Sequence, residues 1–416
     1  MKNIFPFCLL LLLIGTGQAD AKTSAKEKNT TIHFPSPEGL AMAGYQGWFN
    51  TPNDGAELGW KHYQKSQRFE PDYCTIDFWP DVSEYAKTCE TPFKLADGTS
   101  ARVFSSHDAS TTDLHFRWMR DYGIDGVYMQ RFVATLRSQK SIDNLDYILF
   151  NALAAAEKYG RAICLMYDLS GMKPEEVQSV MADWKRLCSK GIVSQKNNYY
   201  LHCNGRPLVG IWGVGFSDAG RAYSLSDSEK LIDFFIAQGC SVLLGLPARW
   251  RTLTGDAVSD PALHALIAKA DVVHPWLVGR FNNESYPRFQ AEIAKDVAWC
   301  RQNGKFYMPV IWPGFSWYNL KNGTAPSDAI PRLGGTFFWN QAEGALRAGA
   351  TSFYYAMFDE MDEGTAIFKC TNDVPVGPSP FVTYHGLPSD HYLWLAGQAA
   401  RMLRGEIPLT KEIPSR

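Results

Sequence analysis

The chain has 416 residues, of which 45% are hydrophobic, and its formal net charge at pH 7 is −2. This length and composition permit a large buried core, organised either as one α/β barrel or as two smaller domains. The near-neutral charge, without any block of Lys and Arg, argues against a nucleic-acid partner. The 13 Trp, 19 Tyr and 24 Phe supply flat rings that could stack on sugars, although most aromatic side chains belong to protein cores.

The first 21 residues have the pattern of a secretory signal peptide. Lys2 precedes an apolar run that ends at Ile14, and Ala19 and Ala21 form the small-residue pattern of a cleavage site. The apolar run is too short to span a bilayer comfortably, and no later segment of that length is free of charge. We therefore expect residues 1–21 to be removed and the mature protein to be secreted or periplasmic, without a membrane span.

The chain has nine cysteines, and Cys8 lies inside the predicted signal, so the mature protein would keep eight. An even number permits disulfides in an oxidising compartment, but the pairing cannot be deduced from sequence. Cys74 and Cys89, in a loop-like segment, are the first pair to test. No Cys-x-x-Cys or His-x-x-x-His spacing occurs, so we do not expect a structural zinc site. We expect neither another metal site nor a cofactor.

Beyond residue 40, short apolar or β-branched runs alternate with amphipathic stretches, which is typical of βα units around a parallel sheet. The predicted strands are 41–49, 126–132, 162–171, 207–216, 241–250, 271–281, 306–315 and 352–360. Residues 141–160 read as a helix, with Ser141 as the expected N-cap and Gly160 as the C-terminal stop. Eight strands, each followed by a helix, predict a (β/α)8 TIM barrel.

We expect this barrel to occupy residues 41–404, with an N-terminal extension at 22–40 and a C-terminal tail at 405–416. Residues 50–108 are too long for an ordinary connection between a strand and a helix. They are therefore predicted to be a loop insertion after the first strand. Long segments of this kind are usually lids, binding loops or disordered regions.

Barrel active sites lie where the strands end and the following loops begin. Nearly every predicted strand here ends in polar or aromatic residues. A single Trp at a strand end usually belongs to the packing, but a merely structural barrel would need only turn residues at all eight ends. The candidate substrate-binding residues are Tyr45, Gln46, Trp48, Arg131, Tyr167, Asp168, Trp212, Trp250, His274, Trp276, Arg280 and Trp312.

The stretch YYAMFDEMDEGTAIF, 354–368, places four acids directly after the last predicted strand. They could be the solvated first turn of a helix, where the macrodipole favours carboxylates. Alternatively, the strand delivers Asp359 and Glu360 over the barrel mouth, and Gly364 permits a sharp turn. Glu360 and Glu363 would then share a partly desolvated face and repel each other, so that one keeps its proton. A neutral acid beside an ionised base is what glycosidic cleavage requires.

The string FDEMDEGTAIF resembles the acid-x-x-acid-Gly-Thr-x-Ile motif of glycoside hydrolase family 99, the endo-α-mannosidases and endo-α-1,2-mannanases. It resembles more loosely the α-1,3-glucanases of family 71. PVIWPGFSW is similar to the Pro-Gly-aromatic stretch that ends the seventh strand of family 99. The resemblance implies that Glu363 is the general acid/base. It also implies that Glu360 deprotonates the sugar's own 2-hydroxyl, which gives a 1,2-anhydro sugar and retention of configuration.

The sequence departs from the family at the sixth strand, where His274-Pro275-Trp276 stands in place of a Tyr that faces the reacting sugar. This departure affects the identity of the substrate more than the class of reaction. The sequence thus predicts a monomeric, secreted, retaining α-glycoside hydrolase of endo-α-1,2-mannosidase type, acting on a polysaccharide or glycan. The alternatives are an α-glucanase or exo-acting glycosidase of the same clan, a non-catalytic glycan-binding barrel, and a metal-assisted hydrolase.

Overall fold

Eight parallel strands form the centre of the computed structural model, which describes residues 1, 32–193, 198–218 and 220–416. One of the eight is split in two. The strands are β1 (Ala41–Tyr45), β4 (Gly126–Phe132), β5 (Ala162–Asp168), β7 (Arg206–Trp212), β8 (Ser241–Pro247), β9 (Val272–Trp276), β10 (Phe306–Tyr307) with β11 (Val310–Ile311), and β12 (Phe353–Tyr355). A two-residue strand, β6 (His202–Cys203), pairs antiparallel with β7.

The ring closes through the split seventh strand. Its first half, β10, pairs with β9, and its second half, β11, pairs with β12. Pro309, between the halves, has no N–H to donate, but its carbonyl accepts a hydrogen bond from the Tyr354 N–H at 3.0 Å. Because β1 pairs with both β12 and β4, the eight strands form a closed sheet. The predicted (β/α)8 barrel is confirmed.

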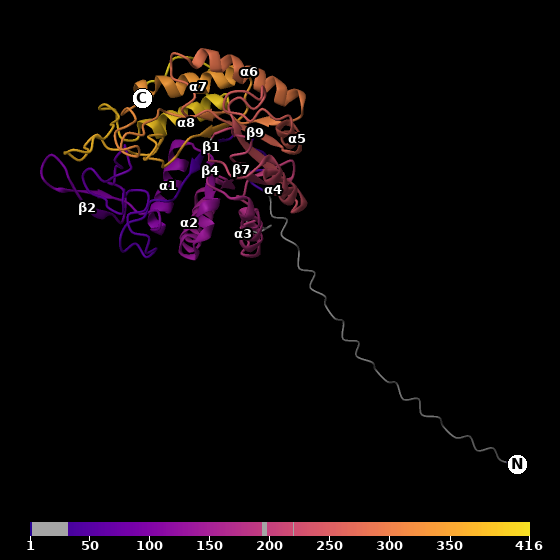
Figure 1. Cartoon of the computed structure of the whole chain (residues 1–416), viewed down its shortest axis with the longest axis horizontal. Helices are drawn as coiled ribbons and strands as arrows, with labels where there is room; N and C mark the ends of the chain where they lie inside the picture. Colours follow the sequence, from indigo (N-terminus) through magenta and orange to yellow (C-terminus); the bar gives the residue numbers. More distant parts are fainter. Residues whose placement is uncertain (2–31, 194–197, 219) are drawn as a thin grey trace. The chain divides into compact units, whose positions relative to one another are not determined.

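An α-helix follows each strand, and Figure 1 shows these helices around the strands. The helices are α1 (Ala109–Tyr122), α2 (Gln139–Tyr159), α3 (Val177–Ser189), α4 (Leu225–Ala237), α5 (Ala262–Lys269), α6 (Tyr286–Gln302), α7 (Thr336–Arg347) and α8 (His391–Leu403). Short 3-10 helices lie at η1 (Val133–Arg137), η2 (Pro174–Glu176) and η3 (Leu333–Gly335).

Local sequence signals predict the C-terminal end of α2 correctly and its N-terminal end incorrectly. Gly160 adopts a left-handed φ of 64° and ends the helix, as predicted. The N-cap is Ser138, whose hydroxyl accepts from the Ser141 N–H at 3.4 Å, so the prediction that Ser141 caps the helix is wrong by one turn. Two serines three residues apart offer the same capping chemistry.

The insertion at 50–108 is an ordered, packed unit. It contains an antiparallel hairpin of β2 (Cys89–Lys94) and β3 (Ser100–Val103). Buried rings hold it together: Phe69 lies 4.9 Å from Phe93, and Trp79 lies 5.2 Å from Phe93, between ring centroids. Aromatic pairs at these distances stabilise a small core. The insertion therefore has a small hydrophobic core of its own.

Several sequence expectations concern the termini and the cysteines. The predicted signal at 1–21 and residues 22–31 of the predicted extension lie outside the described residues. Within the described part of the chain, no helix is long and apolar enough to cross a membrane. The eight cysteines that the structure describes are all free thiols, so the suggested pairing of Cys74 with Cys89 is not formed.

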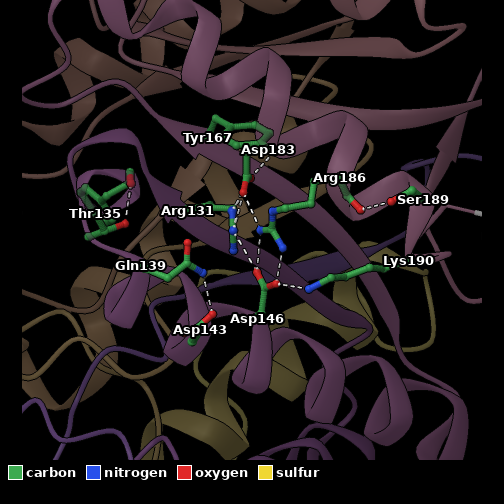
Figure 2. Close-up of polar contacts among 11 residues, drawn as sticks. Arg131, Thr135, Gln139, Asp143, Asp146, Tyr167, Asp183, Arg186, Ser189 and Lys190 are labelled. Atoms are coloured by element: carbon green, nitrogen blue, oxygen red, sulfur yellow. Dashed lines mark hydrogen bonds and ion pairs between the residues drawn. The ribbon is translucent and has the colours of Figure 1, made fainter.

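A buried ion-pair network joins the barrel to two of its helices (Figure 2). Arg131 of β4 is 1% exposed and donates to both carboxylate oxygens of Asp183, at 2.5 and 2.6 Å. It also donates to Asp146 of α2 at 3.0 Å. The Tyr167 hydroxyl of β5 donates to Asp183 at 2.8 Å, and Arg186 contacts both acids. These contacts connect β4 and β5 with α2 and α3.

Asp183→Asn removes the two shortest charge-assisted contacts of the buried Arg131 and leaves only Asp146 to compensate it, so the free energy of unfolding should fall by about 3 kcal/mol. The matched control is Glu57→Gln, which breaks an exposed, solvent-screened pair with Lys140 and should leave the stability nearly unchanged. Urea unfolding followed by circular dichroism measures both. Equal transition midpoints for the two variants would mean that the network does not carry this stability.

Candidate active site

The acid-bearing segment leaves the barrel after β12 and forms a tight turn at 361–364, and not the start of a helix. Helix α8 begins only at His391. Gly364 has a φ of 65°, and a Cβ there would lie 2.7 Å from the Ser316 backbone nitrogen. That same nitrogen donates to the Glu363 carbonyl at 3.0 Å. Glycine is therefore required both by the backbone conformation and by the close approach of the neighbouring loop.

Glu360 and Glu363 face one cavity of about 290 Å³ at the carboxyl-terminal mouth of the barrel. Its other walls come from the ends of β1, β4, β5, β7, β9 and β12 or from the residues that follow them. They are Gln46, Trp48, Gln130, Phe132, Asp168, Ser170, Trp212, Trp276, Tyr354 and Met357. Carboxylates and amides beside aromatic faces suit a ligand that carries hydroxyl groups on an apolar ring.

Asp359 has a structural part in this site. It is fully buried, and its two carboxylate oxygens accept hydrogen bonds from the backbone N–H groups of Gln46 and Gly47, each at 2.8 Å. Burial raises the pKa of Asp359 to about 7, and the two backbone donors oppose that rise. The contact ties the end of β12 to the end of β1, which lie side by side in the ring.

Glu360 is held by two side-chain donors. The Gln46 side-chain amide donates to one carboxylate oxygen at 2.7 Å, and the Thr365 hydroxyl donates to the other at 2.8 Å. Burial raises the pKa of Glu360, and repulsion from Glu363 raises it further. The two donors act in the opposite direction, because hydrogen bonds to a carboxylate favour its charged form.

Glu363 is half-buried, and burial together with the neighbouring Asp362 raises its pKa to about 8. The indole of Trp317 lowers it somewhat. Two negative charges in one cavity repel each other, so Glu360 and Glu363 together retain one proton at neutral pH. Because Glu360 receives two oriented donors, we assign the charge to Glu360 and the proton to Glu363.

Five of the predicted substrate-binding residues line this cavity: Gln46, Trp48, Asp168, Trp212 and Trp276. The Trp212 and Trp276 rings lie 5.4 Å apart in an edge-to-face arrangement, and both are half-buried. Burial raises the pKa of Asp168 to about 6, while the Ser170 N–H donates to it at 2.7 Å. These groups present rings and hydrogen-bonding atoms to the same space.

Three predicted residues point to the other side of the sheet. Successive side chains of a strand alternate between its faces, so only one of two neighbours can face the barrel interior. Gln46 and Asp168 face the cavity, whereas Tyr45 and Tyr167 are fully buried among the helices. Arg131 belongs to the ion-pair network described above. The expectation that these three contact substrate is corrected by this alternation.

Three more predicted residues lie away from the cavity. Trp250 and Trp312 are fully buried and pack against Trp299 and Phe337, at centroid distances of 4.9 and 4.8 Å. Arg280 is exposed and pairs with an acid of a neighbouring loop. All three lie beyond the ordered ends of β8, β9 and β11, where the predicted strands extended too far. Their assignment as substrate contacts is therefore wrong for this arrangement.

His274 lies inside the barrel but beneath the cavity. Its ring is fully buried, 4.4 Å from that of Tyr354, and its Nδ1 contacts the Met308 carbonyl at 3.1 Å. Burial lowers the pKa of His274 to about 4, so the ring is neutral and Nδ1 donates this bond. His274 thus supports Tyr354, which does line the cavity, and does not line it itself.

Five cavity residues were absent from the predicted set: Gln130, Phe132, Ser170, Tyr354 and Met357. Gln130 and Phe132 are two apart on β4, as Asp168 and Ser170 are at the end of β5, so period-two spacing from a known inward residue could have found them. No local signal marked Tyr354 or Met357. Among the described residues, no cluster of three or more His, Cys, Asp or Glu could hold a metal ion.

Comparisons with known proteins find similarity in structure but not in sequence. No family model matches the sequence, and no curated protein matches it either. A solved structure of the GH99 endo-α-mannosidase from Bacteroides thetaiotaomicron superposes with a TM-score of 0.62 at 15% identity, over 88% of this chain and 98% of that chain. A second structure of that description, in complex with BIS-TRIS-Propane, gives 0.61 at 16% identity with the same coverage. The chain shares the barrel fold of these structures.

Proposed function

We propose that the protein is a retaining α-glycoside hydrolase, with endo-α-1,2-mannosidase or mannanase-like specificity for an α-mannan-like glycan. The observation that carries the proposal is the pair Glu360 and Glu363, which one turn presents to one aromatic-lined cavity. Their environments separate their protonation states, as cleavage of a glycosidic bond requires. The motif around the pair and the fold shared with an endo-α-mannosidase support the same reaction.

In the first step, the ionised Glu360 takes the proton of the sugar's 2-hydroxyl. The freed O2 attacks the anomeric carbon, and the bond from that carbon to the leaving oxygen breaks. Glu363 gives its proton to the leaving oxygen, and a 1,2-anhydro sugar remains. Gln46 and Thr365 keep Glu360 oriented for this proton transfer through bonds of 2.7 and 2.8 Å.

In the second step, water opens the anhydro ring at the anomeric carbon. Glu363, now a carboxylate, takes a proton from the water, and Glu360 returns its proton to O2. Both acids regain their starting states, so the cycle consumes only glycan and water. Two inversions at the anomeric carbon give net retention, without a sugar–enzyme bond.

The experiment that tests the function is product analysis on yeast α-mannan, with an α-1,3-glucan as the second substrate. Release of α-configured reducing ends from the mannan supports the proposal. Release of reducing ends from the glucan alone would favour the alternative hypothesis of an α-glucanase. A non-catalytic glycan-binding barrel would retain polysaccharide and liberate nothing from either substrate.

Glu363→Gln should lower kcat/KM on the natural glycan by about 10²- to 10⁴-fold, because a poor leaving group needs the proton that Glu363 supplies. A substrate with a fluoride leaving group needs no such proton and should lose much less. Steady-state kinetics on both substrates measure the difference, with the exposed Glu284→Gln as the matched control. If both substrates lose activity equally in a folded variant, Glu363 is not the acid.

Glu360→Gln should abolish activity even on the glycosyl fluoride, because a better leaving group does not replace the missing internal nucleophile. For the same reason, a 2-deoxy substrate should be nearly inert with the unmodified enzyme. Mass spectrometry after treatment with a 2-deoxy-2-fluoro glycosyl fluoride provides the cross-check, and we expect no adduct. A sugar bound to Glu360 would instead identify a direct nucleophile.

The pH profile should follow Glu363. Its pKa of about 8 means that the protonated form is lost as the pH rises through that value, so kcat/KM should fall on the alkaline side. Asp362→Asn removes a neighbouring negative charge, which lowers the pKa of Glu363. The alkaline limb should therefore move to lower pH. Profiles on one α-mannan oligosaccharide test this, and a limb that stays in place or moves upward would contradict the assignment.

A further inference from the structure

The acid cavity continues into a second hollow of about 180 Å³. The two spaces share four lining residues, Gln46, Trp48, Gln130 and Phe132, so one aromatic wall serves both. The far side of the hollow is formed by residues of the insertion, of η1 and of α2. It includes Lys61, which belongs to the insertion. A glycan unit next to the one over Glu360 and Glu363 would lie here.

Lys61 differs from the other half-buried lysines of the described chain. Lys65 donates to the Asn319 carbonyl, and Lys305 donates to two carbonyls. Lys269 and Lys369 pair with carboxylates. For Lys61, the residues that the structure describes provide neither a hydrogen-bond acceptor nor an ion-pair partner. Lys61 lines the hollow, and its charge has no compensating partner there.

This arrangement has an energetic cost. Burial lowers the pKa of Lys61, and no nearby carboxylate raises it again. A partly desolvated cation without a partner is unfavourable, and an incoming anion removes much of that cost. The adjoining walls are apolar and aromatic, with Trp48 stacked at 3.8 Å on His62. They contribute stacking surface and leave the ammonium group as the charged contact.

We propose that Lys61 binds an oxyanion carried by the sugar next to the cleavage site. The shared chemistry is that of a sulfate ester, a phosphate ester or a uronic acid carboxylate, each of which accepts a charge-assisted hydrogen bond from an ammonium group. The inference rests on the proposed function only for the position of the neighbouring sugar over the acids. It narrows the substrate class, within α-mannan-like glycans, to those that carry an anionic group on that sugar.

The test measures binding, so it does not depend on catalysis. Yeast α-mannan and dextran are each compared with a chemically sulfated, a phosphorylated and a C6-oxidised derivative by affinity electrophoresis. We expect at least one anionic derivative to bind more tightly than its neutral parent. Lys61→Met should weaken the affinity for that anionic derivative about tenfold or more, as expected for loss of a hydrogen bond to a charged group. The affinity for the unmodified parent should not change. The derivative that responds identifies the anion.

Lys140→Met is the matched control, because it removes the same charge from an exposed lysine nearby that pairs with Glu57. It should keep the advantage, and Lys61→Arg should retain most of it. The proposal is overturned if no anionic derivative binds better than its parent, or if Lys61→Met and Lys140→Met have equal effects. It is also overturned if Lys61→Met weakens the binding of neutral and anionic polymers alike. Lys61 would then only balance the negative charge of the acids at 359–363.

Failure of this test differs from failure of the proposed function. Release of products from α-mannan together with indifference to anionic groups would leave the hydrolase intact and remove the role of Lys61. Conversely, selective binding of an anionic polymer that is never cleaved would support Lys61 and leave a binding protein. The two measurements therefore fail independently.

Discussion

The contact between the Asp359 carboxylate and the backbone N–H groups of Gln46 and Gly47 holds the last strand of the barrel to the first. The same contact sets the position of Gln46, whose side chain then reaches Glu360. Closure of the ring and orientation of Glu360 thus both depend on hydrogen bonds to residues 359 and 360. A buried carboxylate with two backbone donors on its oxygens has little freedom to move, so it provides a rigid reference for the groups around it.

The turn at 361–364, which carries Asp362 and Glu363, is also held by hydrogen bonds from residues outside this segment. Arg332 donates to the carbonyls of Gly364 and Ala366 at 2.8 and 2.7 Å. Its guanidinium lies over three aromatic rings, with Phe78 and Tyr392 at 4.3 and 4.5 Å from their centroids. The insertion contributes as well, because the Asp77 N–H donates to the Met361 carbonyl at 3.0 Å. Such support keeps the carboxylates of the turn within a narrow range of geometry.

Four adjacent acids consequently have separate parts. Asp359 anchors the backbone, Glu360 receives donors that favour its charge, and Glu363 remains half-buried with a raised pKa. Asp362 contributes repulsion, which raises the pKa of Glu363. The composition of the turn alone could not separate these roles, since each depends on which donors and charges the folded chain brings near.

The sequence by itself determined the barrel, because eight apolar runs that alternate with helical stretches leave few other ways to bury strands on both faces. It also determined that Glu360 and Glu363 follow the last strand and that Gly364 permits the turn between them and the returning chain. Only the tertiary structure decided which strand-end residues face the cavity. Alternation predicts that neighbours on a strand face opposite ways, but only the folded barrel showed that Arg131 and Tyr167 are the outward ones. The true strand ends likewise left Trp250 and Trp312 in the core. The physical reason is that orientation, burial and partnership arise from contacts between segments far apart in the chain, which local patterns do not encode.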